Sequence, residues 1–275
     1  MAGWRAWAAG VIAALALHPA AAAPARRIVS INLCADVLVL TLAERRHIDA
    51  VSTIAADPVV SPVAARARGL PTNRADAEAI VALDPDVVVA AEYSATATRA
   101  LLAHLGVPVV VVRMAHDLAG VRAEIARVAA ALGVAGRGRA VVAAMAARLA
   151  RLPPPAPVPP TVALLGPGGW ESSAGSLAGA VLAAAGFRLY ETTGGRTTLE
   201  RLAMQPPDAL VIDESYAEAP SLANERLAHP ALVAAIPAAH RVAIPARLWI
   251  CPGPAVAEAA LRLARFRLAL ARSGG

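Results

Sequence analysis

The chain contains no lysine, so all 26 of its basic residues are arginines. The arginines are scattered along the sequence, without runs of like charge and without aromatic residues interleaved among them. A nucleic-acid-binding surface concentrates its positive charge in a patch or stripe. Despite a formal net charge of +6, the sequence therefore does not indicate a nucleic-acid partner.

Cysteine is almost as scarce, since only Cys34 and Cys251 occur. Their spacing fits no metal-binding motif. In an oxidising compartment disulfides persist, and a bond between these two residues would join the two ends of the chain. We expect the two side chains to lie close in space, and the sequence leaves open whether they form a disulfide or remain two free thiols.

The motifs that usually mark enzymes are also missing. The sequence has no GxGxxG, no P-loop, no GxSxG and no HExxH. A glycine-rich turn at residues 166–169 is interrupted by a proline and lacks a third glycine, which makes it a poor phosphate loop. Of the histidines beyond the first segment, only His116 lies near the end of a predicted strand. A lone histidine does not make a metal site, so we expect no bare metal ion.

The first segment reads as a targeting signal. Arg5 precedes an apolar run at residues 6–17, and small residues follow at 20–23. This run is shorter than the ~20 residues that a membrane-spanning helix needs. The pattern is typical of a secretory signal peptide, the alternative being an uncleaved membrane anchor. We therefore predict that the protein is periplasmic.

One part of the chain is similar to another part. Residues 74–92 and 196–214 align when shifted by 122 positions, with matching arginines, glutamates and Pro-Asp pairs. Each copy predicts a short amphipathic helix, a break at Pro-Asp and an apolar strand. A repeat at so wide an offset indicates two similar lobes rather than a short-period solenoid. Ligands commonly bind in the cleft between two such domains.

Strands and helices alternate in both halves of the chain. The predicted strands are apolar throughout, which is typical of parallel sheets covered on both faces. We expect an α/β fold with two lobes built on parallel sheets and a long helical segment between them. Glycines at 133–138 predict a short break within that helical segment, and six prolines at 153–160 predict a stiff connector after it. The predicted divisions are a signal peptide at 1–23, an N-terminal lobe at 24–117, a connecting helical segment at 118–152 and a C-terminal lobe at 153–275.

The order of these parts resembles a known family. The chain is similar to class III periplasmic substrate-binding proteins of ABC importers. The similar parts are the strand and loop at 27–32, the stretch at 78–86 with its copy at 200–208, the helical segment between the lobes, and the pair Gly253-Pro254 before a last helix. These are receptors for cobalamin and ferric siderophores. The resemblance implies an α/β fold of two Rossmann-like lobes with parallel sheets joined by a long connecting helix. It also implies a monomer that delivers a metal chelate, such as a ferric siderophore, haem or cobalamin, to an importer permease. It implies no enzymatic activity and no cofactor.

The resemblance also assigns a role to the two glutamates of the repeat. In this family each lobe presents a surface glutamate to arginines of the permease, and the matching positions are Glu78 and Glu200. The alternative is that the glutamates only stabilise helix starts, because Thr197-x-x-Glu200 fits a capping box and the helix dipole favours an acidic first turn. We favour docking, since both glutamates recur together with their neighbours.

Ligand contacts are expected from loops at the carboxyl ends of the parallel strands. Four of the nine aromatic residues fall in such loops, where their rings could stack on a large planar ligand, although any of them could instead pack within its lobe. Nearby arginines could pair with carboxylates or phosphates of the ligand. The predicted ligand-binding residues are Asn32, Cys34, Tyr93, Arg113, Trp170, Tyr216, Arg247 and Trp249. The competing interpretation is a two-lobed enzyme, chelatase-like or glycosyltransferase-like, and the signal peptide argues against it.

Overall fold

The computed structural model describes residues 24–165, 173–190, 198–213 and 229–273. The first lobe is built on a sheet of five parallel strands in the order β3-β2-β1-β4-β5. Its strands are β1 (Ile28–Ser30), β2 (Ile48–Ser52), β3 (Thr72–Asn73), β4 (Val87–Ala91) and β5 (Val109–Val112). Its helices are α1 (Leu33–Leu42), α2 (Ala64–Ala67), α3 (Ala77–Val81) and α4 (Thr96–His104).

The second lobe repeats this plan with four parallel strands in the order β7-β6-β8-β9. They are β6 (Thr161–Leu165), β7 (Arg188–Leu189), β8 (Ala209–Asp213) and β9 (Arg241–Ile244). Its helices are α7 (Leu177–Ala184), α8 (Leu199–Met204), α10 (Pro230–Ala235) and α11 (Val256–Ser273). Because β7-β6-β8-β9 has the same connectivity as β2-β1-β4-β5, the two-lobed α/β fold predicted from the repeat is confirmed.

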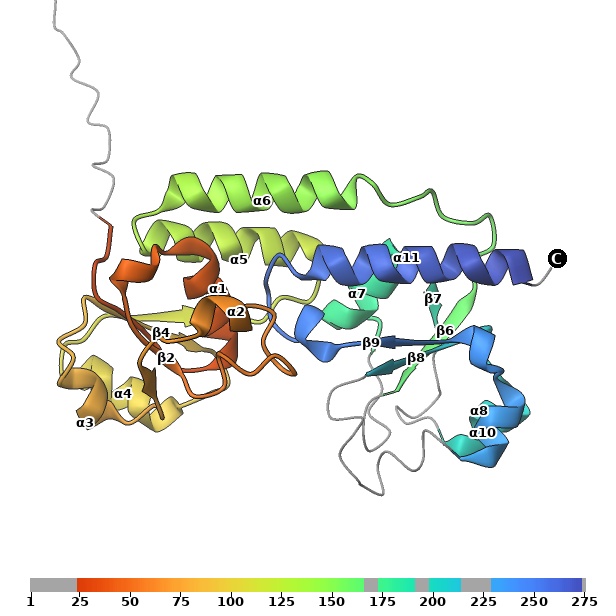
Figure 1. Ribbon diagram of the computed structural model, residues 1–275, viewed down its shortest axis with the longest axis horizontal. Coiled ribbons are helices and arrows are strands. Elements are labelled where there is room, and N and C mark those ends of the chain that lie inside the picture. The colour runs from red at the N-terminus through yellow and green to blue at the C-terminus, as the bar shows by residue number, and fades with distance from the viewer. Residues whose placement is uncertain (1–23, 166–172, 191–197, 214–228, 274–275) are drawn as a thin grey trace, which may run out of the picture.

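Two antiparallel helices, α5 (Leu118–Ala131) and α6 (Ala135–Leu149), connect the lobes (Figure 1). The predicted break at 133–138 is too long, because α6 already begins at Ala135. Gly133 makes the turn with a φ of 72°, whereas Gly138 lies inside the helix. A Cβ built on Gly138 would lie 2.4 Å from the Cβ of Ala129, so this glycine allows α6 to pack closely on α5 and does not end a helix.

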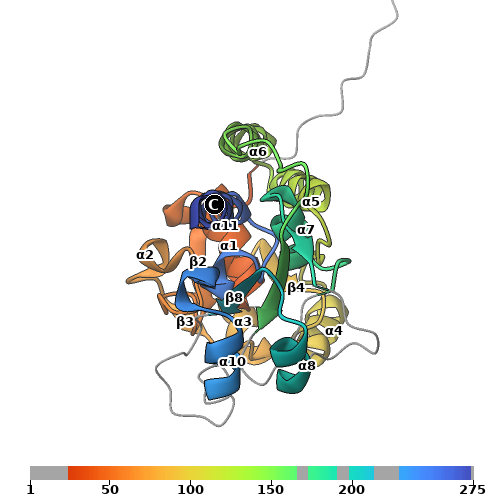
Figure 2. The same ribbon diagram turned by 90° about the vertical axis from the view of Figure 1, so that its right-hand side faces the viewer.

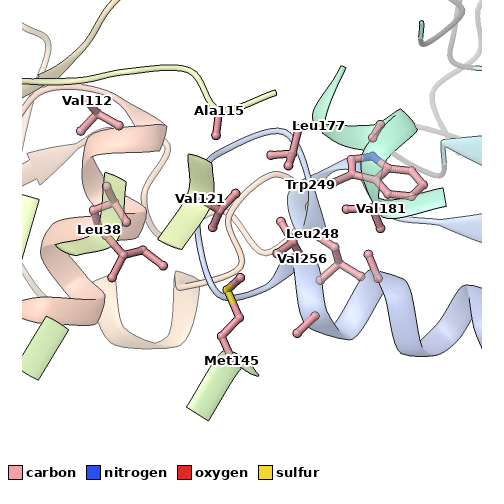
Figure 3. Packing of buried hydrophobic residues seen from close by; sticks show 14 of the residues in the cluster. Leu38, Val112, Ala115, Val121, Met145, Leu177, Val181, Leu248, Trp249 and Val256 are labelled. Atoms are coloured by element: carbon pink, nitrogen blue, oxygen red, sulfur yellow. The ribbon is translucent and has the colours of Figure 1, made fainter. Parts of the chain in front are cut away.

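The helices cover the sheets in two layers. In the end-on view α5, α6 and α11 lie above the sheets with α1 and α7, while α3, α4, α8 and α10 lie below (Figure 2). The upper layer encloses one continuous core that contains residues of both lobes, among them Leu38 of α1, Met145 of α6 and Val181 of α7 (Figure 3). The lower layer encloses two separate cores, one beneath each lobe. The two lobes are therefore joined by packing as well as by the chain.

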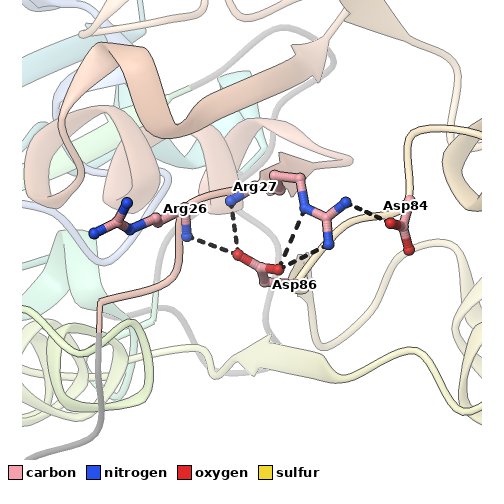
Figure 4. A network of polar contacts seen from close by, with 4 residues as sticks. All are labelled: Arg26, Arg27, Asp84 and Asp86. Carbon is pink, nitrogen blue, oxygen red and sulfur yellow. Dashed lines mark hydrogen bonds and ion pairs between the residues drawn. The ribbon is translucent and has the colours of Figure 1, made fainter.

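The repeated Pro-Asp pair has a structural role in both lobes. Asp86 Oδ2 accepts hydrogen bonds from the backbone N–H groups of Arg26 (2.8 Å) and Arg27 (3.0 Å) just before β1 (Figure 4). Asp208 Oδ2 accepts from the hydroxyl (2.7 Å) and the N–H (2.7 Å) of Thr161 at the start of β6. These bonds hold the pKa of each aspartate below its usual range. In each lobe the aspartate thus fixes the first strand beside its neighbour.

Candidate functional site

A disulfide between Cys34 and Cys251 locates the place where the two sheets meet. Cys34 lies in the first turn of α1, directly after β1, and Cys251 follows β9 and the short helix η3 (Ala246–Leu248). Their Cα atoms are 5.0 Å apart, so the segments that follow β1 and β9 meet at this point. Ligands of parallel α/β proteins bind beyond the carboxyl ends of the strands. This junction is therefore the candidate site.

The same loop before α11 is packed tightly on the first lobe. A Cβ built on Gly253 would lie 2.6 Å from Cγ1 of Val37 on α1, so any larger residue here would have to displace Val37. Cys251 is itself buried. The disulfide consequently closes an interface that is already in close contact, and of the two outcomes left open by the sequence the bonded one is found.

Asn32 connects two loops of the first lobe at this junction. Its Oδ1 accepts from the N–H of Ala35 (3.0 Å) and so caps α1. Its Nδ2 donates to the hydroxyl of Ser94, in the loop after β4. Both polar atoms of the Asn32 side chain, which the sequence predicts as a ligand contact, thus bond within the protein. Asn32 therefore fixes the loops that surround the site.

Asp36 is a buried carboxylate that the sequence-based choice of site residues missed. It is 0% exposed, and it accepts from the hydroxyl of Ser30 (2.6 Å) and from the N–H (3.0 Å) and hydroxyl of Ser52. These serines are the last residues of β1 and β2. Burial raises the pKa of Asp36 despite the three hydrogen bonds. The available signal was that Asp36 is the one charged residue in α1, whose other residues are apolar except for Thr41.

Two predicted ligand contacts present exposed side chains. Tyr93 follows β4 and is 79% exposed, and Arg113 follows β5 and is also exposed. The backbone at Arg113 is held in place, because its N–H donates to Oε1 of the buried Glu124 at 2.7 Å. A fixed backbone with an exposed guanidinium suits a residue that pairs with an anionic group.

Trp249 does not present its ring to a ligand. It is 6% exposed and belongs to the core shared by the two lobes, where its ring lies beside Leu177 and Val181 of α7 (Figure 3). The expectation that this ring stacks on a ligand fails because η3 turns the chain inward before the disulfide. The alternative, that such rings pack within the lobes, holds at this position.

The other predicted contacts are distributed differently. Arg247 lies in η3 and lines a groove beside the junction, together with residues of α1, α6 and α11. Trp170 and Tyr216 lie outside the described residues. Sequence position at a strand end therefore places residues at the junction but does not say which way their side chains point.

Glu78 and Glu200 occupy matching places in the two lobes. Both are exposed and stand two residues after the N-cap of α3 and α8, the caps being Asp76 and Thr198. The side chain of Thr198 accepts from the N–H of Arg201, so Thr198 and not Thr197 is the cap. This register does not match the capping box that was the alternative interpretation of Glu200.

Two kinds of feature are absent from the described part of the chain. No three side chains among histidine, cysteine, aspartate and glutamate gather there as ligands of a metal ion would. None of the helices there has both the length and the apolar character of a membrane span.

Comparison with known proteins identifies relatives. A sequence model of the periplasmic binding protein family matches residues 28–243. The periplasmic heme-binding protein BhuT, in complex with two hemes, is 25% identical with a TM-score of 0.70, over 89% of this chain and 98% of that chain. The vitamin B12 binding protein BtuF of Vibrio cholerae is 17% identical with a TM-score of 0.62, over 90% and 98% of the two chains. A protein of an Fe3+-hydroxamate transport system from Saccharomonospora viridis is 20% identical with a TM-score of 0.67, over 88% and 93%. The last two likenesses show the fold alone, and no curated protein sequence matches significantly.

Proposed function

Because the chain belongs to the periplasmic binding protein family, we propose that it binds an organic metal chelate in the periplasm and delivers it to an ABC importer. The observation that carries the proposal is the likeness to a heme-binding protein along 98% of that protein's length. Structures with the same fold include proteins named for vitamin B12 and for Fe3+-hydroxamate transport. These ligands are chelates, so the ligand class proposed here is a ferric siderophore, haem or cobalamin.

The chelate would be held at the junction of the two sheets. Tyr93 supplies an aromatic face and Arg113 an exposed guanidinium on the first lobe. From the second lobe, Trp170 and Tyr216 complete the proposed contacts on the strength of their positions in the sequence. The protein binds this ligand without transforming it.

The experiment is purification of the protein from the periplasm of its native cells. Its N-terminus should fall between Ala23 and Arg26, and its absorption spectrum should show the band of a bound haem, corrin or ferric chelate. The chelate should be released chemically unchanged, and its amount should be stoichiometric with the amount of protein. A mature chain that begins at Met1, catalytic turnover of the chelate, or no binding of any of the three chelates at micromolar concentration would each contradict the proposal.

A single substitution tests the aromatic contact. Tyr93→Ala should weaken chelate binding by about tenfold, since a stacked ring contributes roughly 0.5–1.5 kcal/mol beyond its buried area. Titration of the chelate against tryptophan fluorescence measures this change. Met204→Ala is the matched control, because Met204 is 81% exposed on α8, away from the junction. Equal affinities of the Tyr93 variant and the control would remove Tyr93 from the site.

The exposed glutamates support a second part of the proposal, that Glu78 and Glu200 dock the two lobes onto the permease. Two carboxylates at equivalent helix positions suit a partner with matching arginines. Each Glu→Gln substitution should lower transport by about two- to fivefold, and the double substitution by about tenfold or more, because an exposed ion pair contributes up to ~1 kcal/mol.

Uptake of the chelate by permease-containing vesicles measures the effect, and chelate affinity should stay unchanged in all three variants. Glu44→Gln is the control, since its side chain is 63% exposed and pairs with Arg46 in the first lobe. Reduced chelate affinity or impaired folding in the single variants, with normal transport per bound chelate, would favour a role in the helix starts.

A further inference from the structure

A groove of about 580 Å³ lies beside the junction, on the side of the helical layer. One wall comes from the first lobe, from α1 and residues 58–68 with α2. The other wall comes from the second lobe, from η3 and the first turns of α11, and α6 closes one end. A ligand in this groove would therefore contact both lobes at once.

The charged side chains of the groove are strongly unbalanced. Five of them are guanidinium groups and one is a carboxylate, and they belong to Arg66, Arg68, Arg148, Arg247, Arg262 and Glu258. Guanidinium groups remain protonated at neutral pH. Gathering them in one concave surface raises the local positive potential and favours anions.

The one carboxylate is already fully engaged. Glu258 accepts from Nε of Arg262 at 2.8 Å and pairs with Arg148 at 3.5 Å. The bond from Arg262 holds the pKa of Glu258 below its usual range. Arg66 donates to the backbone oxygen of Leu40 at 2.9 Å. Three of the five arginines thus have partners within the protein.

Arg68 and Arg247 differ from these three. Within the described residues, neither side chain makes a hydrogen bond or an ion pair. Arg68 comes from the first lobe, directly after α2, and Arg247 comes from η3 of the second lobe. An arginine whose side chain has no partner in the described part of the chain therefore lines the groove on each of its two walls.

We propose that this groove binds a small oxyanion of the phosphate type, with two or more negative charges, bridged between Arg68 and Arg247. Planar guanidinium groups bind phosphate oxygens through paired hydrogen bonds. The anion would neutralise the excess charge and tie the lobes together, so its binding should stabilise the fold. The proposal assigns Arg247 to this groove and not to the chelate, and it uses neither Tyr93 nor Arg113. Its test contains no chelate.

The test is a titration of the purified protein with pyrophosphate, measured by isothermal calorimetry and by the thermal unfolding midpoint. Sodium chloride at matched ionic strength corrects for screening. Saturable binding with a raised midpoint is the expected result. Substituting both Arg68→Gln and Arg247→Gln should weaken the affinity by about tenfold for each arginine removed. The double variant Arg122→Gln/Arg137→Gln removes the same charge from exposed positions on α5 and α6 outside the groove, and it should bind like the unmodified protein.

A third variant provides a gain of binding. Glu258→Gln should release Arg148 and Arg262 and tighten pyrophosphate binding severalfold, since the competing carboxylate is gone. Vesicles of anionic phospholipid distinguish the source of the phosphate group: binding of vesicles that pyrophosphate displaces assigns a lipid headgroup, and binding of pyrophosphate alone assigns a free oxyanion. The proposal is wrong if pyrophosphate has no effect beyond that of chloride, or if the two double variants bind it equally.

Discussion

Replacing Cys34 and Cys251 together by serine should lower the free energy of unfolding by about 4 kcal/mol. The disulfide closes a loop with a sequence separation of 217 residues, and the entropy that a crosslink removes from the unfolded chain grows with loop length. For a chain of this size the loss corresponds to a fall of about 10 °C in the thermal midpoint. Thermal or denaturant unfolding of the two proteins under oxidising conditions measures the difference.

Reduction offers an independent control for this prediction. The unmodified protein in excess reductant should unfold at the midpoint of the double serine variant, whereas the variant should not respond to reductant. Titration of the denatured, unreduced protein should find no free thiol. Two titratable thiols, or a midpoint that neither substitution nor reduction changes, would show that the bond does not form in the protein as it is made.

The disulfide also bears on the motion of the lobes. It joins α1 of the first lobe to the loop before α11, where Gly253 already packs on Val37. The shared core and the helix pair α5 and α6 provide two further connections. Three connections at one junction leave little freedom for a hinge, so ligand binding should close the lobes only slightly. The disulfide should therefore affect both the stability of the fold and the motion of the lobes.

The repeat made the fold predictable from the sequence. An amphipathic helix, a Pro-Asp pair and an apolar strand recur at one offset, and the structure places each copy at an equivalent position in its lobe, with the N-caps Asp76 and Thr198 at the same offset. The pattern works because each of its residues has a local cause: the caps begin the helices, and the aspartates fix the first strands. Short edge strands such as β3 and β7, with two residues each, carry no comparable pattern, so the sequence does not predict them.

The site was less predictable because side-chain direction depends on the packing of distant segments. Trp249 and Arg247 stand two residues apart after β9, yet one ring enters the shared core and the other side chain lines the groove. A single helical turn in η3 makes this difference. Asp36 shows the same limit, since its partners are the ends of β1 and β2, and only the folded sheet brings Ser30 and Ser52 together.

Asp36 gives the second large effect, and its two substitutions should behave differently. Asp36→Ala removes the acceptor for two serine hydroxyls and for the buried N–H of Ser52. Leaving such groups unpaired, together with the cavity, should lower the free energy of unfolding by about 3 kcal/mol. Asp36→Asn keeps the shape and one carbonyl acceptor, and its amide can donate to a serine oxygen. It should therefore unfold within about 1 kcal/mol of the unmodified protein at neutral pH.

The dependence on pH separates the charge of Asp36 from its shape. Burial raises the pKa of Asp36 in the folded state, so its contribution to stability is complete below the ordinary carboxyl pKa and is lost as the pH rises through the raised value. The unmodified protein should gain stability relative to Asp36→Asn on going from neutral pH to about pH 4. Asp208→Asn is an opposite control, because hydrogen bonds from Thr161 lower the pKa of Asp208. The contribution of Asp208 to stability is therefore lost as the pH falls through its pKa in the folded state. Unfolding midpoints of the three proteins across this range test the assignment. If the difference between the unmodified protein and Asp36→Asn does not change with pH, the Asp36 carboxyl titrates alike in the folded and unfolded chain, and the assignment is wrong.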